Sequence, residues 1–478
     1  MSAIGNVATV VAAPSGESFR RQLGLADLMA YGLAYIAPIA PLSTLGLVWA
    51  ASHGMIALAY LLGGVCMAFT AFSYAAMVRE VHSAGSVYGF ARAVLGPFAG
   101  FVAGWMILLD YLLIPAFVYV VMAVALGQLM PGIDRALWIV LLAGFTTAVN
   151  WFGIGSTTRV STGAVIVQVA VLAALMGLAA YVRLHSMGAP GGAPGLGSAP
   201  FYSTPFSLSA VLAGTSICVM SFLGFDAIST LAEDTADRTG RTLGLAILLV
   251  LGFATTLFVL AAWILGNAMQ GAHFISLDAA AYELAGQLGG VWAGIGLAWA
   301  YAILVGLSNA LPMQVGVARV LYAMGRDRQL PAALARLHPR YNTPHVAMLV
   351  STGVSVVVAL WLRDAMDQLA AFVNFGALFG FALIHVCVMV HFARSPKRNA
   401  ALHVVSPVLG IAVVAAILTG MNHAALVLGV VWMVLGLCWW RFRIVRLGLS
   451  PATTRLIRSR KSEAGLSICR RVGGNTRA

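Results

Sequence analysis

The chain has 478 residues, of which 61% are hydrophobic and only 9% charged. Soluble proteins carry roughly 25% charged residues, so this composition excludes a soluble globular protein and places the chain in a membrane. The net charge of +13 does not require a nucleic acid partner, because basic residues gather in the cytoplasmic loops of membrane proteins.

Long apolar runs predict an all-α integral membrane protein with twelve transmembrane helices, since a span needs about 20 apolar residues and a β-barrel would show short alternating segments. The predicted spans, in chain order, are 25–50, 54–78, 97–127, 136–153, 160–183, 208–232, 243–269, 286–318, 345–362, 368–392, 404–422 and 424–445.

The basic residues support this count. If the N-terminus is cytoplasmic, all but three of the 28 Lys and Arg residues fall in inner segments, and the exceptions are Arg135, Arg183 and Arg363. A missed or extra span would scramble this asymmetry. We therefore expect both termini on the cytoplasmic side of a bacterial-type inner membrane.

The remaining segments are short. Residues 1–22 form a cytoplasmic tail without the apolar core of a signal peptide. Residues 186–207 are rich in Gly, Pro and Ser, which predicts a flexible external linker between two halves, and 446–478 form a basic cytoplasmic tail that contacts anionic lipid. Four of the five cysteines lie in spans and one in the basic tail, so no disulfide framework is expected.

Two spans contain residues that interrupt a helix. The first span carries Pro38 and Pro41, which lack an N–H and disturb the preceding turn, and the sixth carries Ser221 and Gly224 at its middle. Kinks from proline are common in membrane helices, which is the alternative explanation. Interrupted helices at corresponding positions of two repeats, however, are a typical sign of a transporter's central binding site.

Two acidic residues lie deep within spans, Asp110 in the third and Asp226 in the sixth. A charge at the centre of a bilayer costs about 2.5–3.5 kcal/mol on insertion scales. No Lys or Arg lies deep in any span to pair with them, so each acid requires a proton or a cationic ligand unless it is a hydrogen-bonded structural acid. Tyr111, next to Asp110, is placed to line the same cavity.

Other polar residues have simpler explanations. Ser308, Asn309, Asn374 and His385 lie in spans, where hydrogen bonds between helices explain them, although His385 is also a candidate proton carrier. Glu233, at the end of the sixth span, is a candidate for gating the inner opening. Enzyme motifs and clusters of metal ligands do not occur in the sequence, so we expect a protein without catalysis, metal or cofactor.

Three stretches resemble the amino acid–polyamine–organocation permeases, over about residues 19–445. They are S-A-G-S-V-Y-G-F-A-R-A-V-L-G-P-F-A-G-F-V-A-G-W from Ser83, S-F-L-G-F-D-A from Ser221, and A-R-V-L-Y-A-M-G-R-D-R-Q-L-P from Ala318. Within that superfamily the sequence is most similar to bacterial putrescine importers, which share G-L-A-Y in the first span, L-D-Y-L-x-x-P in the third and F-L-G-F-D-A in the sixth.

The resemblance implies an inverted repeat of five plus five spans, 23–185 and 208–392, followed by two further helices in 393–445. Substrate would lie between the first, third, sixth, eighth and tenth spans. The acid associated with amine recognition falls on Asp226 and the glycine of the unwound stretch on Gly224.

A site aromatic falls on Phe222 or on Met220, and the methionine departs from the aromatic that some relatives carry there. We expect one ammonium at Asp226 and another at Asp110 or at a carbonyl near the first span. Tyr35, Tyr111 and Phe222 would pack the methylenes and offer ring faces to the cations.

Two departures from the family pattern refine this expectation. Amino acid permeases use small residues in the first span to hold a substrate carboxylate, but the corresponding stretch here is Ala34-Tyr35-Ile36, which favours a substrate with amines and no acid. Gln168 stands where proton-coupled relatives often carry lysine, so proton coupling would use Asp226, Asp110, Glu233 or a histidine. We thus expect a proton-driven putrescine importer working by alternating access, with an amino acid permease or exchanger as the alternative, and a receptor or channel as a third.

Overall fold

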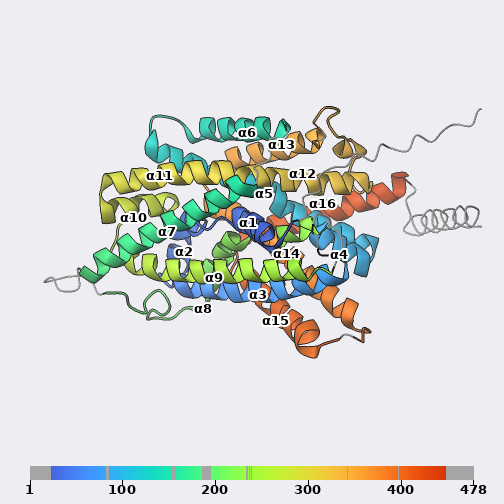
Figure 1. Ribbon diagram of the computed structural model, residues 1–478, viewed down its shortest axis with the longest axis horizontal. Coiled ribbons are helices and arrows are strands. Elements are labelled where there is room, and N and C mark those ends of the chain that lie inside the picture. Colours follow the sequence, from blue (N-terminus) through green and yellow to red (C-terminus); the bar gives the residue numbers. More distant parts are fainter. Residues whose placement is uncertain are drawn as a thin grey trace, which may run out of the picture.

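The computed structural model describes residues 23–81, 85–152, 158–185, 195–232, 235, 237, 239–341, 343–396 and 398–447. Most of these residues form helices. Within the described ranges, β-type hydrogen bonding is limited to one isolated bridge between Leu23 and Thr235. The prediction of an all-α protein is confirmed. Figure 1 shows the helices packed as one elongated bundle.

The first half of the chain contains these α-helices: α1 Leu25–Ile36, α2 Pro41–Ala51, α3 Ile56–Glu80, α4 Ser86–Val94, α5 Pro97–Leu129, α6 Arg135–Trp151 and α7 Thr158–His185. The second half contains α8 Leu208–Cys218, the 3₁₀ segments η2 Val219–Phe222 and η3 Asp226–Leu231, α9 Arg241–Met269, η4 Leu277–Ala279, α10 Ala280–Gly289, α11 Val291–Val305, the π-helical turn η5 Gly306–Ala310, α12 Leu311–Arg326, η6 Ala332–Ala335, α13 His345–Trp361, α14 Met366–Phe392, the π-helical turn η7 Ala401–Val405, α15 Ser406–Thr419 and α16 His423–Leu447.

Eight helical segments in the described ranges are long and apolar enough to cross a membrane, and α1 with α2 adds a ninth if the pair is one broken span. Three shorter apolar helices, α6, α11 and α13, coincide with further predicted spans. The chain is thus a multi-pass membrane protein, while the count of twelve and the inverted repeat stay predictions.

One predicted span is misplaced at its start. The apolar run 286–318 was expected to be continuous, but α10 ends at Gly289 and α11 begins at Val291. Gly290 lies between them with φ of 81°, a left-handed conformation that glycine adopts without strain. The corresponding helix therefore begins at Val291 and continues through η5 into α12.

The core of the bundle is built around α5, which packs against α14, α4, α11, α13 and α6. All residues from Gly100 of this helix to Ala125, except Val102 and Trp105, are buried. Because protein surrounds α5 on all sides, its polar residues lie in the interior of the bundle, away from lipid. α3 and α9 run side by side along one flank (Figure 1).

Part of the predicted linker is attached to the bundle. The carbonyl of Pro200 accepts hydrogen bonds from the backbone N–H groups of Ala57 (2.9 Å) and Leu58 (3.2 Å) at the start of α3. The N–H of Gly197 donates to Asn267 Oδ1 of α9 at 3.0 Å. Residues 195–207 thus cover the end of the bundle where α3 begins and α9 ends, and 186–194 lie outside the described residues, as do the tail 1–22 and all but the first two residues of 446–478.

Candidate functional site

The first membrane segment is interrupted between α1 and α2, at the prolines that the sequence pointed to. α1 ends at Ile36 and α2 begins at Pro41, with 51° between the two helices. Ala37, between them, has φ of 59°, which costs a residue with a Cβ about 1–2 kcal/mol. Pro38 and Pro41 have no N–H to continue the helical ladder.

The sixth predicted span is interrupted as well. α8 passes into η2, Leu223 is extended, and Gly224 has φ of 122° before η3 starts at Asp226. A Cβ on Gly224 would lie 2.5 Å from Tyr35 Cδ1 and 3.0 Å from the Ile36 nitrogen. Glycine is therefore required both by the backbone conformation and by contact with the first break. The two breaks meet each other in the middle of the bundle.

Asp226 lies beside this contact and is buried, with 3% of its surface exposed. Its Oδ1 accepts a hydrogen bond from the Gly224 N–H at 3.2 Å, and its Oδ2 accepts one from the Tyr111 hydroxyl at 3.3 Å. None of the salt bridges among the described residues includes Asp226. Two neutral donors hold the carboxyl group in place, and its charge has no basic partner there.

Asp110 of α5 is the second buried acid, with 5% exposed. Its Oδ1 has no hydrogen-bond partner among the described residues. The backbone of Asp110 packs directly on Gly376 of α14, where a Cβ would lie 2.7 Å from the Asp110 nitrogen. A buried carboxyl oxygen without a partner is costly, so this position favours a proton or a cation.

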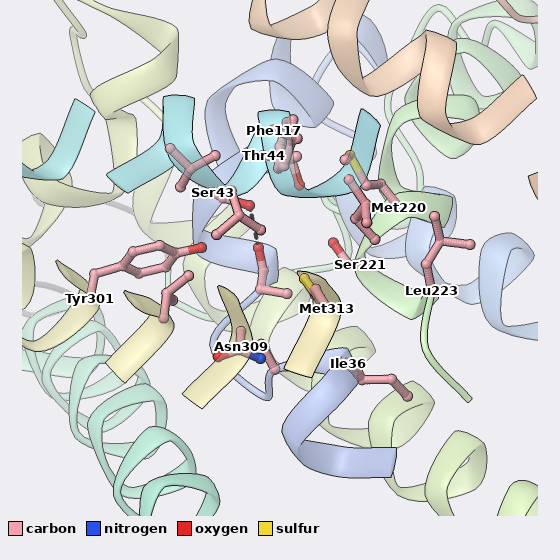
Figure 2. Close-up of a pocket in the computed structure, with 16 residues that line it drawn as sticks. Ile36, Ser43, Thr44, Phe117, Met220, Ser221, Leu223, Tyr301, Asn309 and Met313 are labelled. Atoms are coloured by element: carbon pink, nitrogen blue, oxygen red, sulfur yellow. Dashed lines mark hydrogen bonds between the residues drawn. The ribbon is translucent and has the colours of Figure 1, made fainter. Parts of the chain in front are cut away.

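A cavity of about 50 Å³ lies next to the two breaks (Figure 2). A water molecule needs roughly 10–15 Å³, so this space suits a few waters and must widen for a larger solute. The lining residues come from the first break, α2, α5, η2, α11, η5 and α12, and they are Ile36, Ala37, Ala40, Ser43, Thr44, Ile114, Phe117, Val118, Val121, Met220, Ser221, Leu223, Tyr301, Val305, Asn309 and Met313.

The wall of the cavity and Asp110 lie on one face of α5. Ile114, Phe117 and Val121 line the cavity from α5, and Asp110 precedes Ile114 by four residues, about one helical turn. Residues at this spacing lie above one another on a helix. The face of α5 that forms the cavity wall therefore continues directly to Asp110.

Phe222 does not line this cavity. Its ring packs against Tyr60 and Phe258, with centroids 6.1 and 5.2 Å away, and none of its surface is exposed. The 3₁₀ turn η2 directs Met220 and Ser221 to the cavity and Phe222 toward α3 and α9, and the expected contact of Phe222 with substrate stays a prediction. Met220 was the alternative position.

Sequence reasoning missed several cavity residues. Figure 2 shows Ser43, Tyr301, Asn309 and Ser221 around one space, from α2, α11, η5 and η2. Tyr301 and Ser43 carry no signal in the sequence, because each lies in an otherwise ordinary apolar helix. Asn309 was recognised only as a hydrogen-bonding residue.

Gln168 of α7 reaches the first break through Asn309. Its Nε2 donates to Asn309 Oδ1 at 3.2 Å, and Asn309 Nδ2 donates to the carbonyl of Ala34 in the last turn of α1. Gln168 and Asn309 are both buried. Two neutral amides therefore connect α7, η5 and α1 at the position where a charged lysine was considered.

His385 of α14 lies apart from the cavity. Its Nδ1 is 2.8 Å from Ser73 Oγ and its Nε2 is 3.4 Å from Thr70 Oγ1, both on α3. The ring also packs on Gly410 of α15. These contacts match hydrogen bonding between helices, as does the bond from Asn374 Nδ2 to the Ser216 carbonyl at 2.6 Å. Glu233 lies outside the described residues.

Tyr35 packs between Gly224 at the second break and Gly316 of α12. It covers Gly224 on one side, and its hydroxyl lies 3.4 Å from where a Cβ of Gly316 in α12 would stand. It is 3% exposed. The structure thus brings together Tyr35, Tyr111, Gly224 and Asp226, with Asp110 on the adjoining face of α5.

Comparison with known proteins supports a transport function. The family model described as amino acid permease matches residues 29–444. The low-affinity putrescine importer PlaP of Escherichia coli (strain K12) is 30% identical over 432 residues, which cover 89% of this chain and 94% of the relative. The branched-chain amino acid permease BcaP of Bacillus subtilis (strain 168) is 28% identical, with 90% of this chain and 95% of the relative covered.

A third relative, the methylthioribose transporter of Bacillus subtilis (strain 168), is 24% identical over 83% of this chain and 86% of its own length. Each relative matches this chain over most of its own length, and the three are named as an importer, a permease and a transporter. The match over residues 29–444 covers most of the protein. The chain belongs to the amino acid permease family.

Proposed function

We propose that this protein imports a small diamine, putrescine or a close relative, across the inner membrane by alternating access. The observation that carries the proposal is Asp226, a buried carboxyl group at the break of a membrane helix, held by the Gly224 N–H and the Tyr111 hydroxyl without a basic partner among the described residues. A primary ammonium supplies the missing charge and its hydrogen-bond donors.

The second ammonium of a diamine has its place at Asp110. Its unpartnered Oδ1 lies on the α5 face that continues into the cavity wall. The apolar side chains of Ile114, Val118 and Leu223 offer the contact that methylenes need. Opening of the cavity by movement of the segments around the two breaks would connect it to both acids.

The first break argues against an α-amino acid. Binding an α-carboxylate there needs free backbone N–H groups, but Pro38 and Pro41 have none, and the N–H groups of Ala37 and Ala40 donate to the carbonyls of Leu33 and Ala37 at 3.0 and 2.8 Å. These donors are already used within the chain. The site is therefore better suited to a cation without a carboxylate.

The proposal includes the finer points of architecture and coupling. We infer twelve spans arranged as two five-span repeats, 23–185 and 208–392, with two additional helices in 393–445 and both termini in the cytoplasm. We also infer that transport is coupled to protons that enter together with the amine, carried by Asp226, Asp110, Glu233 or a histidine. A protonophore that collapses the gradient should then abolish accumulation of labelled putrescine in cells.

The central test is uptake of labelled putrescine by cells that express the wild type or Asp226→Asn. Removing the charge of a buried ion pair costs about 3–5 kcal/mol, so uptake by the variant should fall at least about a hundredfold. The matched control is Asp364→Asn, which changes an acid that is 71% exposed. Unimpaired uptake by Asp226→Asn contradicts the role of Asp226, and absence of uptake by the wild type contradicts the substrate.

An amino acid permease or exchanger is the second candidate, favoured by the likeness to the branched-chain amino acid permease BcaP. Competition separates the two: inhibition of uptake by diamines but not by amino acids supports diamine import, and the reverse supports the alternative. A channel or receptor would show no acceleration of uptake by substrate on the opposite side of the membrane.

A further inference from the structure

A second cavity, far larger than the first, opens at the end of the bundle where α3 ends and α9 begins. It has a volume of about 620 Å³. Its lining comes from α3, α9, the segment before α9, the end of α14 and η7, and the residues are Phe72, Ala75, Ala76, Arg79, Glu80, Thr239, Arg241, Leu248, Phe392, Leu402 and His403. We refer to it as the α3–α9 cleft. The predicted topology places it on the cytoplasmic side.

Tight backbone packing brings two arginines together at the opening of the cleft. Gly240, with φ of 67°, lies so close to the end of α3 that a Cβ on it would be 2.4 Å from the Val78 carbonyl oxygen. Arg79, at the end of α3, and Arg241, at the start of α9, flank this contact. Both are exposed, and neither forms a salt bridge with another described residue.

Arg92 gives the contrast. Its guanidinium forms a salt bridge with Asp327, and the Tyr88 hydroxyl also donates to that carboxylate, at 2.6 Å. The charge of Arg92 is thus neutralised within the protein. The charges of Arg79 and Arg241 instead face the opening of the α3–α9 cleft.

The acids nearest to the cleft have other partners. Glu80 lies 3.7 Å from His391 of α14, and His403 stacks on Phe392 with ring centroids 3.7 Å apart. Asp237 accepts hydrogen bonds from the Thr239 hydroxyl (2.6 Å) and the Thr242 N–H (2.9 Å). These bonds, with Thr239 first, hold the pKa of Asp237 below its ordinary value. Both acids are thus held by other groups, and the two guanidinium groups at the opening form no salt bridge with either of them.

The cleft becomes apolar with depth. Phe72 precedes Arg79 by seven residues on α3, and Leu248 follows Arg241 by seven on α9, which is two helical turns or about 11 Å in each case. Since the two helices are antiparallel neighbours, both apolar residues lie at the same depth below the arginines. Phe72 is 42% exposed and Leu402, on the η7 side, is 47% exposed.

We propose that the α3–α9 cleft binds an anionic phospholipid, with the phosphate between Arg79 and Arg241 and an acyl chain along Phe72 and Leu248. The two arginines at the opening match a phosphate headgroup, and the apolar residues two helical turns deeper match an acyl chain. Basic pockets between helices on the cytoplasmic side are suited to anionic headgroups. This site is separate from the transport site, because none of its lining residues lines the central cavity.

The test uses the full-length protein purified in neutral detergent and native mass spectrometry with phosphatidylglycerol or phosphatidylcholine of the same acyl chains. Wild type should bind phosphatidylglycerol more tightly than phosphatidylcholine. Each arginine removed, as Arg79→Ala or Arg241→Ala, should weaken phosphatidylglycerol binding roughly fivefold. The matched control Arg336→Ala changes an exposed arginine outside the cleft and should leave binding unchanged.

Two further measurements keep the test independent of folding and of the ligand's source. The charge-preserving variant with Arg79→Lys and Arg241→Lys should retain preference for phosphatidylglycerol, and soluble glycerol phosphate should bind far more weakly than the lipid. The proposal would be overturned by equal binding of the two lipids, by unchanged binding in both Arg79→Ala and Arg241→Ala, or by binding of glycerol phosphate as tight as that of the lipid. None of these outcomes bears on diamine transport.

Discussion

The two breaks in the membrane helices, one between α1 and α2 and one between η2 and η3, are made by different residues. Between α1 and α2 the break is made by Pro38 and Pro41 around a strained Ala37 with φ of 59°, and no charged residue lies there. Between η2 and η3 the break is made by Gly224 with φ of 122°, and Asp226 follows at once. The first break therefore only bends the chain, whereas the second places a carboxyl group in the site and allows the backbone at Gly224 to contact Tyr35.

Among substitutions that keep the charge of Asp226, the largest effect is expected for Gly224→Ala, because it combines backbone strain with a Cβ 2.5 Å from Tyr35 Cδ1. Strained backbone alone costs about 1–3 kcal/mol, and the Cβ overlap adds to this cost, so diamine uptake should fall by more than about tenfold. Uptake and thermal unfolding of the purified variant measure this. Gly252→Ala, in α9 with no atom within 4 Å of its Cβ, is the control, and equal behaviour of the two variants would contradict the role given to Gly224.

A smaller effect is expected for Tyr111→Phe, which removes the hydroxyl that donates to Asp226 at 3.3 Å. A hydrogen bond to a charged group contributes about 1.5 kcal/mol at the low end, so the KM for diamine uptake should rise about tenfold. Tyr119→Phe removes a hydroxyl bonded to Thr146 at 2.8 Å, away from the acids, and should leave KM unchanged. A KM for Tyr111→Phe equal to that of wild type would show that this bond does not position the carboxyl group.

The smallest effect is expected for Ala37→Gly in the first break. Glycine relieves the strain of positive φ, about 1–2 kcal/mol, but loses about 0.5–1 kcal/mol of chain entropy. Uptake should therefore stay near wild type, with the unfolding temperature unchanged or slightly raised. If Ala37→Gly lost as much uptake as Gly224→Ala, the claim that the two breaks have different roles would be contradicted.

The two helix breaks could be predicted from the sequence, because they depend on the residues at the breaks themselves. Features that depend on packing between distant parts of the chain could not be predicted. Pro38, Pro41 and Gly224 act on their own backbone, so their effect can be read from the chain. The orientation of Phe222 depends on a 3₁₀ turn and on Phe258 of another helix. The end of α10 at Gly289 was missed because the residues on both sides of it are mostly apolar.

The site was visible in part for the same reason. Asp110 and Asp226 stand out because acids are rare within spans. The role of Asn309 was not visible, because its partner, the carbonyl of Ala34, is 275 residues away. The α3–α9 cleft was hidden as well, since it requires that the ends of two helices meet at Gly240.

The most direct test of the account is counterflow in proteoliposomes that contain purified protein and are loaded with unlabelled putrescine. Because the second break offers a carboxylate and the first offers few free N–H donors, labelled putrescine added outside should accumulate in exchange. Labelled branched-chain amino acid should not accumulate in liposomes loaded with that amino acid. Exchange of the amino acid without exchange of putrescine would contradict the claim that this site recognises a diamine.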